Sequence, residues 1–241
     1  MFARVRERLP LLIGLTILSV ALVIGSFAIA KGIRDRNQNN VITVTGSAKQ
    51  EITSDYAIWD FSVTSQSSSA SDAAKALDGW TQETNSFLKA QGVQPDELTV
   101  QPIATNPVTQ GANNRVVGFQ LTRNYKVRSG RVSAIAGVAE ASSQLLAKGI
   151  PLSAQPLQYV YTKLGDIRAG LLARAVRDAQ QRAKVLTAAT NGKVGSLRGV
   201  DVSPFQVTPP NSTQVSDYGV YDTSTLKKDV TAVVNVTFAL N

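Results

Sequence analysis

The chain of 241 residues contains no cysteine, no histidine and one methionine. Without thiols it cannot form a disulfide framework, a thiolate nucleophile or a cysteine-ligated zinc site. Without imidazole it cannot assemble a His-based catalytic triad or a zincin metal site. The commonest routes to an activated nucleophile are therefore excluded, and the composition favours a protein that works by binding.

Net charge is also small over most of the chain. The 25 Lys+Arg and 17 Asp+Glu residues give a formal net charge of +8, but residues 1–40 hold six of the basic and two of the acidic residues, so residues 41–241 carry only +4. No cluster of basic and aromatic residues accompanies this excess, and nucleic acid is not an expected partner. The apolar share of 43% is ordinary for a globular chain with a buried core.

The long apolar run lies near the amino terminus. Residues 9–30 are uncharged, and about 20 apolar residues suffice to cross a bilayer as a helix. We therefore predict a transmembrane anchor at residues 9–30, with the cationic residues 1–8 in the cytoplasm. A cleaved signal peptide is the alternative, because Ala28-Ile29-Ala30 fits the small-x-small cleavage pattern. Both interpretations export residues 41–241, which follow a polar tether at residues 31–40.

Apolar residues alternate with polar ones in several segments, which predicts strands. The clearest case is Ala57, Trp59, Phe61 and Val63, which share one face of a strand within residues 55–65. An extended segment from Leu98 carries Pro102 and Pro107, and these favour an edge position or an irregular ending. Further strands are predicted at residues 41–47, 117–127, 157–161, 199–207 and 230–240, with a polar loop at residues 208–229.

A spacing of three or four residues predicts three helices, at residues 67–90, 132–147 and 166–191, each followed by a glycine. The buried stripe of the third helix is expected to comprise Leu172, Ala175, Ala179, Ala183 and Leu186. Its small residues permit close approach to a sheet or to another helix. Its charged residues are expected in solvent, namely Arg168, Arg174, Arg177, Asp178 and Arg182.

These elements predict an α+β fold. A mixed, mainly antiparallel sheet is expected to pack with about three helices, and one N-terminal transmembrane helix precedes it.

Polar residues supply two weak hypotheses for chemistry. Ser47 and Lys49 share a face of a predicted strand, as a Ser-Lys dyad would require, but a solvent-facing polar pair explains them equally well. Asp217, Asp222 and Asp229 could supply oxygen ligands to a hard cation, yet their spacing lacks the pattern of a calcium loop. We therefore assign no catalytic, metal or cofactor-binding residue and expect no cofactor.

Aromatic residues supply two binding hypotheses. Tyr218 and Tyr221 lie in the long polar loop, where they would either anchor a protein partner or cover the edge of the domain itself. Trp59, Trp80 and Phe87 would line a ligand groove between sheet and helices, or form part of the core.

Short patterns along the chain resemble the SIMPL-domain family of bacterial exported and membrane-anchored proteins. The opening strand Ile42-Thr43-Val44-Thr45-Gly46 and the strand entry Ser54-Asp55-Tyr56-Ala57 are similar to the family's, although Ser54 replaces the usual proline. The remaining matches follow in family order across residues 41–241: Ala73-Ala74, Gly92-Val93 with Asp96 and Leu98, Gly118-Phe119, the Ala175/Ala179/Ala183 helix with Arg182-Ala183, Gly192, and Val234–Phe238.

The resemblance implies an α+β domain outside the cytoplasmic membrane, a tendency to self-assemble, and links to envelope or oxidative-stress tolerance. It implies no established enzymatic activity. We therefore predict a non-enzymatic protein of the inner membrane whose main domain lies in the periplasm, or which is released there if the signal is cleaved. It would act as a scaffold or interaction module that self-associates through sheet edges or the Ala-rich helix. Capture of a small molecule or lipid is the alternative.

Overall fold

The computed structural model describes residues 19–26, 29–30, 40–214 and 216–240. Within these residues, no helix is both long and apolar enough to cross a membrane. Most of the predicted anchor at residues 9–30, the cationic segment 1–8 and all of the tether except residue 40 lie outside the described residues. The N-terminal transmembrane helix therefore stays a prediction.

The chain is divided into two compact units. Unit 1 comprises Met1–Val44, Gln180–Val200 and Asn235–Asn241, and unit 2 comprises Thr45–Ala179 and Asp201–Val234. The α+β class is confirmed. The expectation of one sheet is wrong, because the described residues form a six-stranded and a five-stranded sheet.

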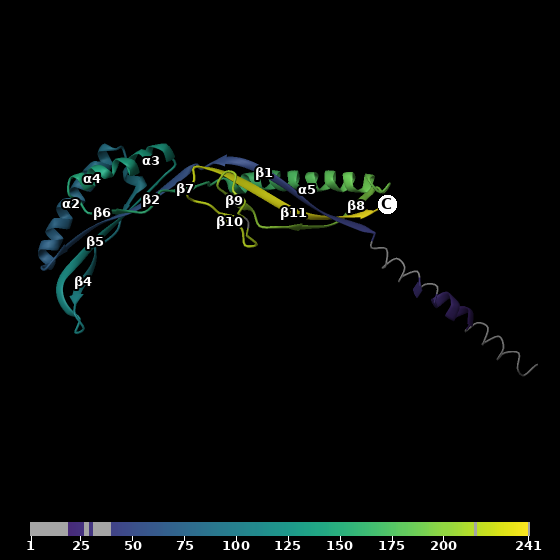
Figure 1. The fold of residues 1–241 in the computed structure, drawn as a ribbon, viewed down its shortest axis with the longest axis horizontal. Helices are drawn as coiled ribbons and strands as arrows, with labels where there is room; N and C mark the ends of the chain where they lie inside the picture. The colour runs from purple at the N-terminus through teal and green to yellow at the C-terminus, as the bar shows by residue number, and fades with distance from the viewer. Residues whose placement is uncertain (1–18, 27–28, 31–39, 215, 241) are drawn as a thin grey trace, which may run out of the picture. The chain divides into compact units, whose positions relative to one another are not determined.

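The six-stranded sheet lies in unit 2 and has the order β3-β5-β2-β6, with β4 added to β5 and β7 added to β2 (Figure 1). All of its pairs are antiparallel. Its strands are β2 (Tyr56–Ser67), β3 (Leu98–Val100), β4 (Ala104–Gln110), β5 (Arg115–Ser129), β6 (Leu152–Ala154) and β7 (Gln158–Val160). The predicted edge position of Pro107 is confirmed, since β4 pairs only with β5 among the described strands.

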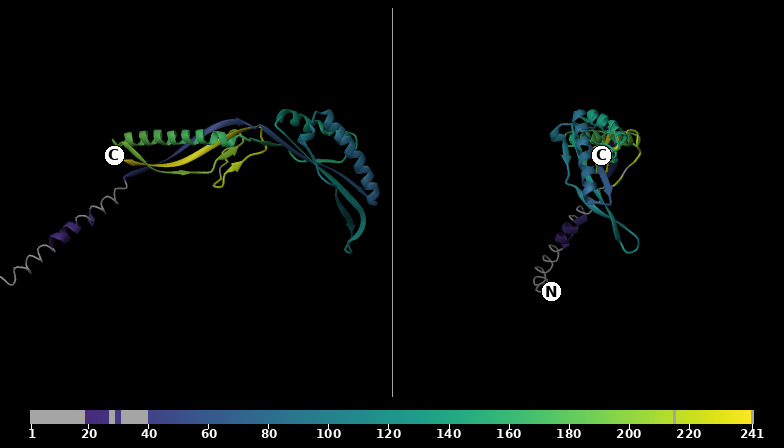
Figure 2. Two further views of the ribbon diagram at one scale, coloured as in Figure 1. Left: turned by 180° about the vertical axis from the view of Figure 1, so that it is seen from behind. Right: turned by 90° about the vertical axis from the view of Figure 1, so that its left-hand side faces the viewer.

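One face of this sheet is buried under helices. The helices are α2 (Ala70–Ala90), α3 (Val132–Ala141) and α4 (Ser143–Ala147), and a 3-10 turn, η1 (Pro95–Glu97), precedes β3. Helices α2 and α3 pack on β2 and β5 (Figure 2). The alternation of β2 is confirmed, because Ala57, Trp59, Phe61 and Val63 are at most 3% exposed. Helix α2 ends at Ala90 and is followed, as predicted, by Gly92, whose φ of 79° few other residues adopt.

The expected single helix over residues 132–147 is wrong, because it is broken between α3 and α4 at Ser142. The Ser142 hydroxyl donates a 2.6 Å hydrogen bond to the Ala139 carbonyl oxygen. The Ser142 N–H donates to the same oxygen at 3.3 Å. A serine that bonds a nearby carbonyl in this way competes with the helical ladder.

The five-stranded sheet has the order β1-β11-β9-β10, and β8 also pairs with β11. Its strands are β1 (Val41–Thr53), β8 (Val194–Val202), β9 (Gln206–Thr208), β10 (Val220–Tyr221) and β11 (Lys227–Leu240). The single strand expected at residues 199–207 is therefore two strands. Pro204 lies between them and lacks the N–H that a continuous ladder would need.

Helix α5 (Leu164–Ala188) lies against β1 through small residues. Ala175, Ala179 and Ala183 are fully buried, as predicted. In unit 2, a Cβ added at Gly46 of β1 would lie 2.2 Å from the Ala175 carbonyl oxygen and 2.5 Å from the Ala179 amide nitrogen. The alanine face therefore permits close approach to the sheet. Because these alanines are buried against β1, this face of α5 is not exposed to a second copy.

The predicted buried stripe of α5 is wrong at two positions. Leu171 rather than Leu172 is fully buried, and Leu186 is 54% exposed. Thr187, four residues after Ala183, takes the position expected of Leu186 and is 4% exposed. Its hydroxyl donates a 2.9 Å bond to the Ala183 carbonyl, so the polar atom is satisfied in the core.

Candidate functional site

The proposed Ser-Lys dyad is not assembled. Ser47 and Lys49 do lie on the exposed face of β1, but the Lys49 ammonium forms an ion pair with Asp229 at 2.5 Å. The backbone N–H of Ser47 donates to the Asp178 carboxylate at 2.8 Å. Lys49 is therefore engaged by the Asp229 carboxylate and is not presented to Ser47 as a base.

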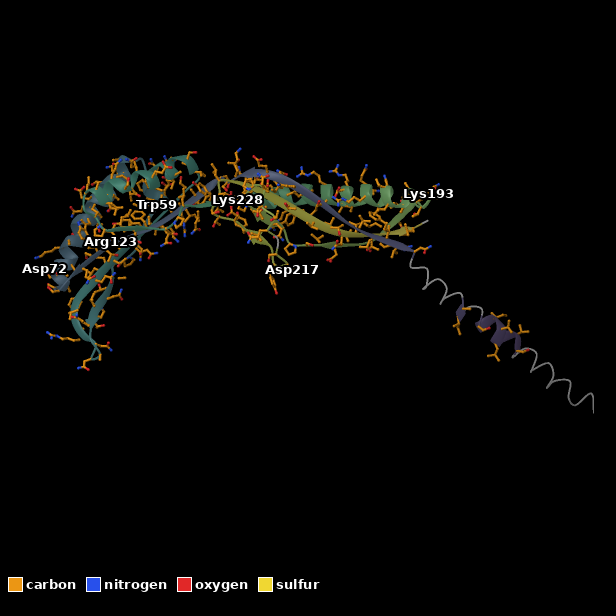
Figure 3. All side chains as sticks on the ribbon, in the orientation of Figure 1. Trp59, Asp72, Arg123, Lys193, Asp217 and Lys228 are labelled. Carbon is orange, nitrogen blue, oxygen red and sulfur yellow. The ribbon has the colours of Figure 1, made fainter. Side chains whose placement is uncertain are left out.

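The three loop carboxylates are not brought together. No group of three acidic side chains that could hold a metal occurs among the described residues. Asp229 pairs with Lys49 and also accepts the Asn211 N–H at 3.2 Å. Asp222 instead forms a 2.8 Å ion pair with Lys228, whose side chain is fully buried. The labelled Asp217 lies on a loop away from Lys228 (Figure 3). Asp222 and Asp229 thus serve different loop contacts, and Asp217 is exposed.

The environment of Asp222 stabilises its charged form. Burial raises its pKa, but hydrogen bonds from Lys228, Ser224 and Thr225 outweigh burial and hold the pKa below its ordinary value. The same lysine donates to the Thr225 carbonyl. These contacts hold the loop before β11 in place. Because the pKa of Asp222 is lowered, its carboxylate has no proton to exchange near neutral pH.

The two loop tyrosines have different roles. The Tyr221 hydroxyl accepts the Tyr161 N–H and donates to the Tyr161 carbonyl, both at 3.0 Å, so Tyr221 covers part of the domain's own edge. Tyr218 is 98% exposed. Of the two residues predicted to be anchors or edge covers, only Tyr218 presents its ring freely.

The aromatic residues predicted to line a ligand groove belong to the core. Trp59 and Phe87 are buried, and Trp80 packs against the same cluster. The Trp59 and Phe61 rings stack at 4.3 Å, and Phe61 stacks on Tyr125 at 4.7 Å. The structure therefore assigns them to packing and gives the ligand hypothesis no groove at this position.

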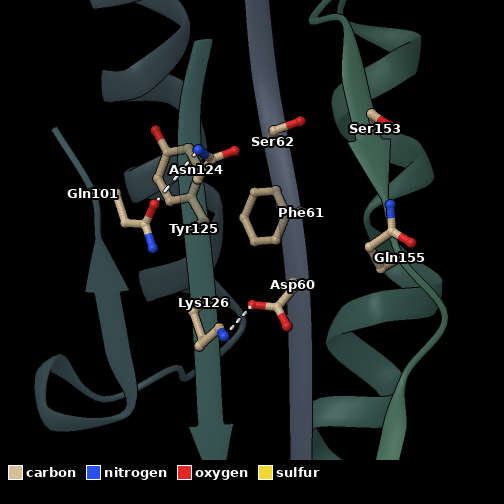
Figure 4. A pocket seen from close by; sticks show the side chains of 9 residues that line it. All are labelled: Asp60, Phe61, Ser62, Gln101, Asn124, Tyr125, Lys126, Ser153 and Gln155. Carbon is tan, nitrogen blue, oxygen red and sulfur yellow. Dashed lines mark hydrogen bonds and ion pairs between the residues drawn. The ribbon is translucent and has the colours of Figure 1, made fainter. Parts of the chain in front are cut away.

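The opposite face of the six-stranded sheet carries a shallow polar pocket of about 220 Å³. Asp60 of β2 pairs with Lys126 of β5 at 3.2 Å, and the Asn124 amide donates weakly to Gln101 at 3.5 Å (Figure 4). The cross-strand ion pair cancels its own charge. This pocket offers neutral hydrogen-bonding groups and no paired carboxylates for acid–base chemistry.

Sequence reasoning predicted the end of β8 within the strand at residues 199–207, but it missed residues 194–198 and the exposure of the strand. Its last seven residues, 196–202, are exposed throughout, and it pairs only with β11 among the described strands. Beyond residue 40, unit 1 exposes several large apolar side chains: Val41, Val185, Leu186, Leu197 and Val200. An exposed strand edge that carries apolar side chains, as β8 does at Leu197 and Val200, is a surface to which another strand can pair. The glycines at 195 and 199 obscure the alternation that would have located it.

Another outer strand of this sheet, β1, is better covered. Asp178 of α5 accepts the Ser47 N–H, and Arg174 donates a 2.6 Å bond to the Gln50 side chain. No side-chain hydrogen bond of this kind reaches β8 among the residues that the structure describes. The candidate functional site is therefore the β8 edge, defined here as residues Val194–Val200 of unit 1, the unit that also exposes Val185 and Leu186 of α5.

A family model described as "SIMPL: Protein of unknown function (DUF541)" matches residues 42–238. The chain belongs to the SIMPL family. A search of curated proteins finds no match.

The residues that carry the SIMPL pattern have structural roles. Gly46 admits the backbone of α5, and a Cβ at Gly118 would lie 2.7 Å from the Ser67 carbonyl oxygen. The Asp55 carboxylate accepts the Thr162 N–H at 2.7 Å and the Thr162 hydroxyl at 2.9 Å. In this SIMPL domain the recognisable motifs thus maintain close packing and strand entry, while the exposed surface lies elsewhere.

Proposed function

We propose that this SIMPL protein is a non-enzymatic, membrane-anchored extracytoplasmic protein that self-assembles through the β8 edge and acts as an envelope scaffold or interaction module. The observation that carries the proposal is the exposed edge of β8, which presents Leu197 and Val200 next to the charged residues Arg198 and Asp201. Natural edge strands are usually blunted by proline, by inward charges or by a covering element. Within Val194–Val202 there is no proline, and Leu197 and Val200 are 53% and 43% exposed.

The physical gain from pairing would come from two sources. Nine residues of strand extend about 30 Å, and their free N–H and C=O groups would bond a second strand. Burial of Leu197 on one face of the strand and Val200 on the other would add apolar contact beside the ladder. A second copy of the same edge supplies both the backbone hydrogen bonds and the apolar contact. Self-association therefore requires no other partner.

Anchoring supports the same function. Residues 9–30 are uncharged and long enough to span a bilayer. Tethering to a membrane restricts copies to two dimensions and raises their effective concentration, so that a weak edge contact can assemble. Stress tolerance would follow if such an assembly reinforces the envelope, which the family resemblance suggests.

Assembly can be tested with the full chain in density-matched neutral detergent by sedimentation equilibrium. We expect a concentration-dependent oligomer, and we expect Leu197→Lys with Val200→Lys to weaken association at least tenfold. The matched control is Val116→Lys with Val117→Lys, at positions that are 50% and 40% exposed on β5. A monomer at every concentration, or equal loss in the control, would contradict the β8 assignment.

Anchoring requires a separate experiment. The intact mass of protein extracted from membranes shows whether residues 1–30 are retained, and protease added to spheroplasts shows on which side residues 41–241 lie. We expect a full-length mass and digestion from outside. Recovery in the soluble periplasmic fraction with an N-terminus at Lys31 would support the cleaved signal, and protection of the domain in spheroplasts would exclude export.

A further inference from the structure

A second surface in unit 2 has the composition of a ligand site. An open groove of about 400 Å³ lies between the first turns of α5 and the segments that carry β9 and β10. Its lining is mostly apolar or aromatic and includes Leu164, Phe205, Val207, Tyr218, Val220 and Tyr221. Arg168 of α5 also lines it. Pockets that bind small molecules combine an apolar lining with a few polar groups that fix orientation.

The walls of the groove are fixed by contacts that do not involve a ligand. Tyr221 pairs with the buried Val207 in the β10–β9 ladder, and its hydroxyl is held by both backbone groups of Tyr161. The Gln206 side-chain amide donates to the Pro204 and Ser216 carbonyls at 3.2 Å and 2.8 Å. The groove is therefore preformed, which lowers the entropy lost on binding.

A tight turn brings the two walls together. Gly219 has a φ of 86°, and a Cβ at this position would lie 3.0 Å from the Phe205 carbonyl oxygen. Glycine adopts this conformation without strain. The turn leaves the neighbouring Tyr218 ring 98% exposed at the mouth of the groove.

The charge of the groove comes from Arg168. Its guanidinium carbon lies 5.6 Å from the centroid of the Phe205 ring, a cation–π geometry that orients the side chain over the groove. No ion pair to Arg168 occurs among the described residues, whereas Arg131 is paired with Glu97 and Lys228 with Asp222. A guanidinium in this position matches a carboxylate.

We propose that this groove binds a small anionic amphiphile, such as a single-chain fatty acid, with Arg168 holding the carboxylate and the apolar lining holding the chain. The inference is independent of assembly at β8. It places the ligand away from Trp59, Trp80 and Phe87, which form the core.

The test uses the full chain in lipid nanodiscs with a diazirine-bearing dodecanoate as the probe. After illumination, mass spectrometry of the digested protein locates the cross-link. We expect labelling within residues 160–170 and 203–221, competition by unmodified dodecanoate, and about fivefold weaker labelling by the uncharged diazirine-bearing dodecanol. Labelling confined to residues 9–30, or equal labelling by the alcohol, would overturn the proposal.

Two variants separate charge from general surface effects. Arg168→Gln removes the charge from an exposed side chain, so the fold should be retained, and we expect about fivefold less cross-linking. Arg177→Gln is the matched control on the same helix, where Arg177 donates to the Ala173 carbonyl one turn earlier. Equal labelling of the Arg168→Gln variant and the parent, with unchanged circular dichroism, would reject the role assigned to Arg168.

Discussion

Substitution of Gly46 by alanine tests the packing of α5 on β1. The added Cβ would lie 2.2 Å from the Ala175 carbonyl oxygen, 2.5 Å from the Ala179 amide nitrogen and 2.7 Å from the Ala179 Cβ. Carbon atoms in contact are normally about 3.5–4.0 Å apart. Two of the three close atoms belong to the helix backbone, so no rotation of a side chain can relieve the overlap, and α5 must retreat by roughly 1 Å.

The expected loss follows from that displacement. Overpacking a well-filled interior costs typically about 1–3 kcal/mol, and a backbone clash belongs at the upper end. Retreat of α5 also loosens the fully buried Leu171, Ala175 and Ala179. We therefore expect the free energy of unfolding to fall by about 3 kcal/mol. For a chain of this size the melting temperature should fall by roughly 6–12 °C.

Thermal unfolding of the full chain in one detergent, followed by far-ultraviolet circular dichroism, measures the effect. Gly79→Ala is the matched control, because a Cβ at Gly79 in α2 meets no heavy atom within 4 Å. Alanine should stabilise that helix by about 1 kcal/mol, so the two substitutions should have opposite signs. Adding Ala179→Gly to Gly46→Ala should not restore stability. A Gly46→Ala variant within about 0.5 kcal/mol of the parent would refute the packing argument.

Three further perturbations test polar contacts. The hydrogen bond from Arg131 to Glu97 lowers the pKa of Glu97 from 4.5 to about 2. Glu97→Gln should therefore lower the free energy of unfolding, measured in urea at pH 7, by about 1–2 kcal/mol once solvent screening is taken into account. Because the folded pKa values of Glu97 and Asp222 lie below their unfolded values, their contribution is complete above about pH 5 and is lost as the pH falls toward 2. Lys228→Met should cost about 3 kcal/mol because it leaves the Asp222 charge without its partner, and adding Asp222→Asn should recover part of that loss.

Each of these has a result that would contradict it. An unfolding free energy of the Glu97→Gln variant that falls with acid as steeply as the parent's would show that Glu97 is not the linked group. If the losses of Lys228→Met and Asp222→Asn simply add in the double variant, the two side chains are not coupled.

Local patterns in the sequence determined which segments form strands and helices and which faces they bury. The alternation of Ala57 to Val63 and the alanine spacing of α5 depend only on the geometry of one element, so they could be predicted correctly. The SIMPL motifs could be recognised for the same reason, because Gly46 and Gly118 are required by close backbone approach. Solvent exposure of Arg168 and the alternative roles of the loop tyrosines were predicted on this basis too.

Tertiary structure alone decided which strands pair and which surfaces remain exposed. Thr43 bonds Thr237 across 194 residues, and Ser47 meets Asp178 across 131, and no local period encodes such partners. The coverage of β1 by α5, the exposure of β8 and the meeting of Arg168 with Phe205 all depend on pairings of this kind. The sequence by itself therefore determined the elements and their buried faces. The candidate sites arose only when distant segments folded together, because a surface is defined by what the rest of the chain leaves uncovered.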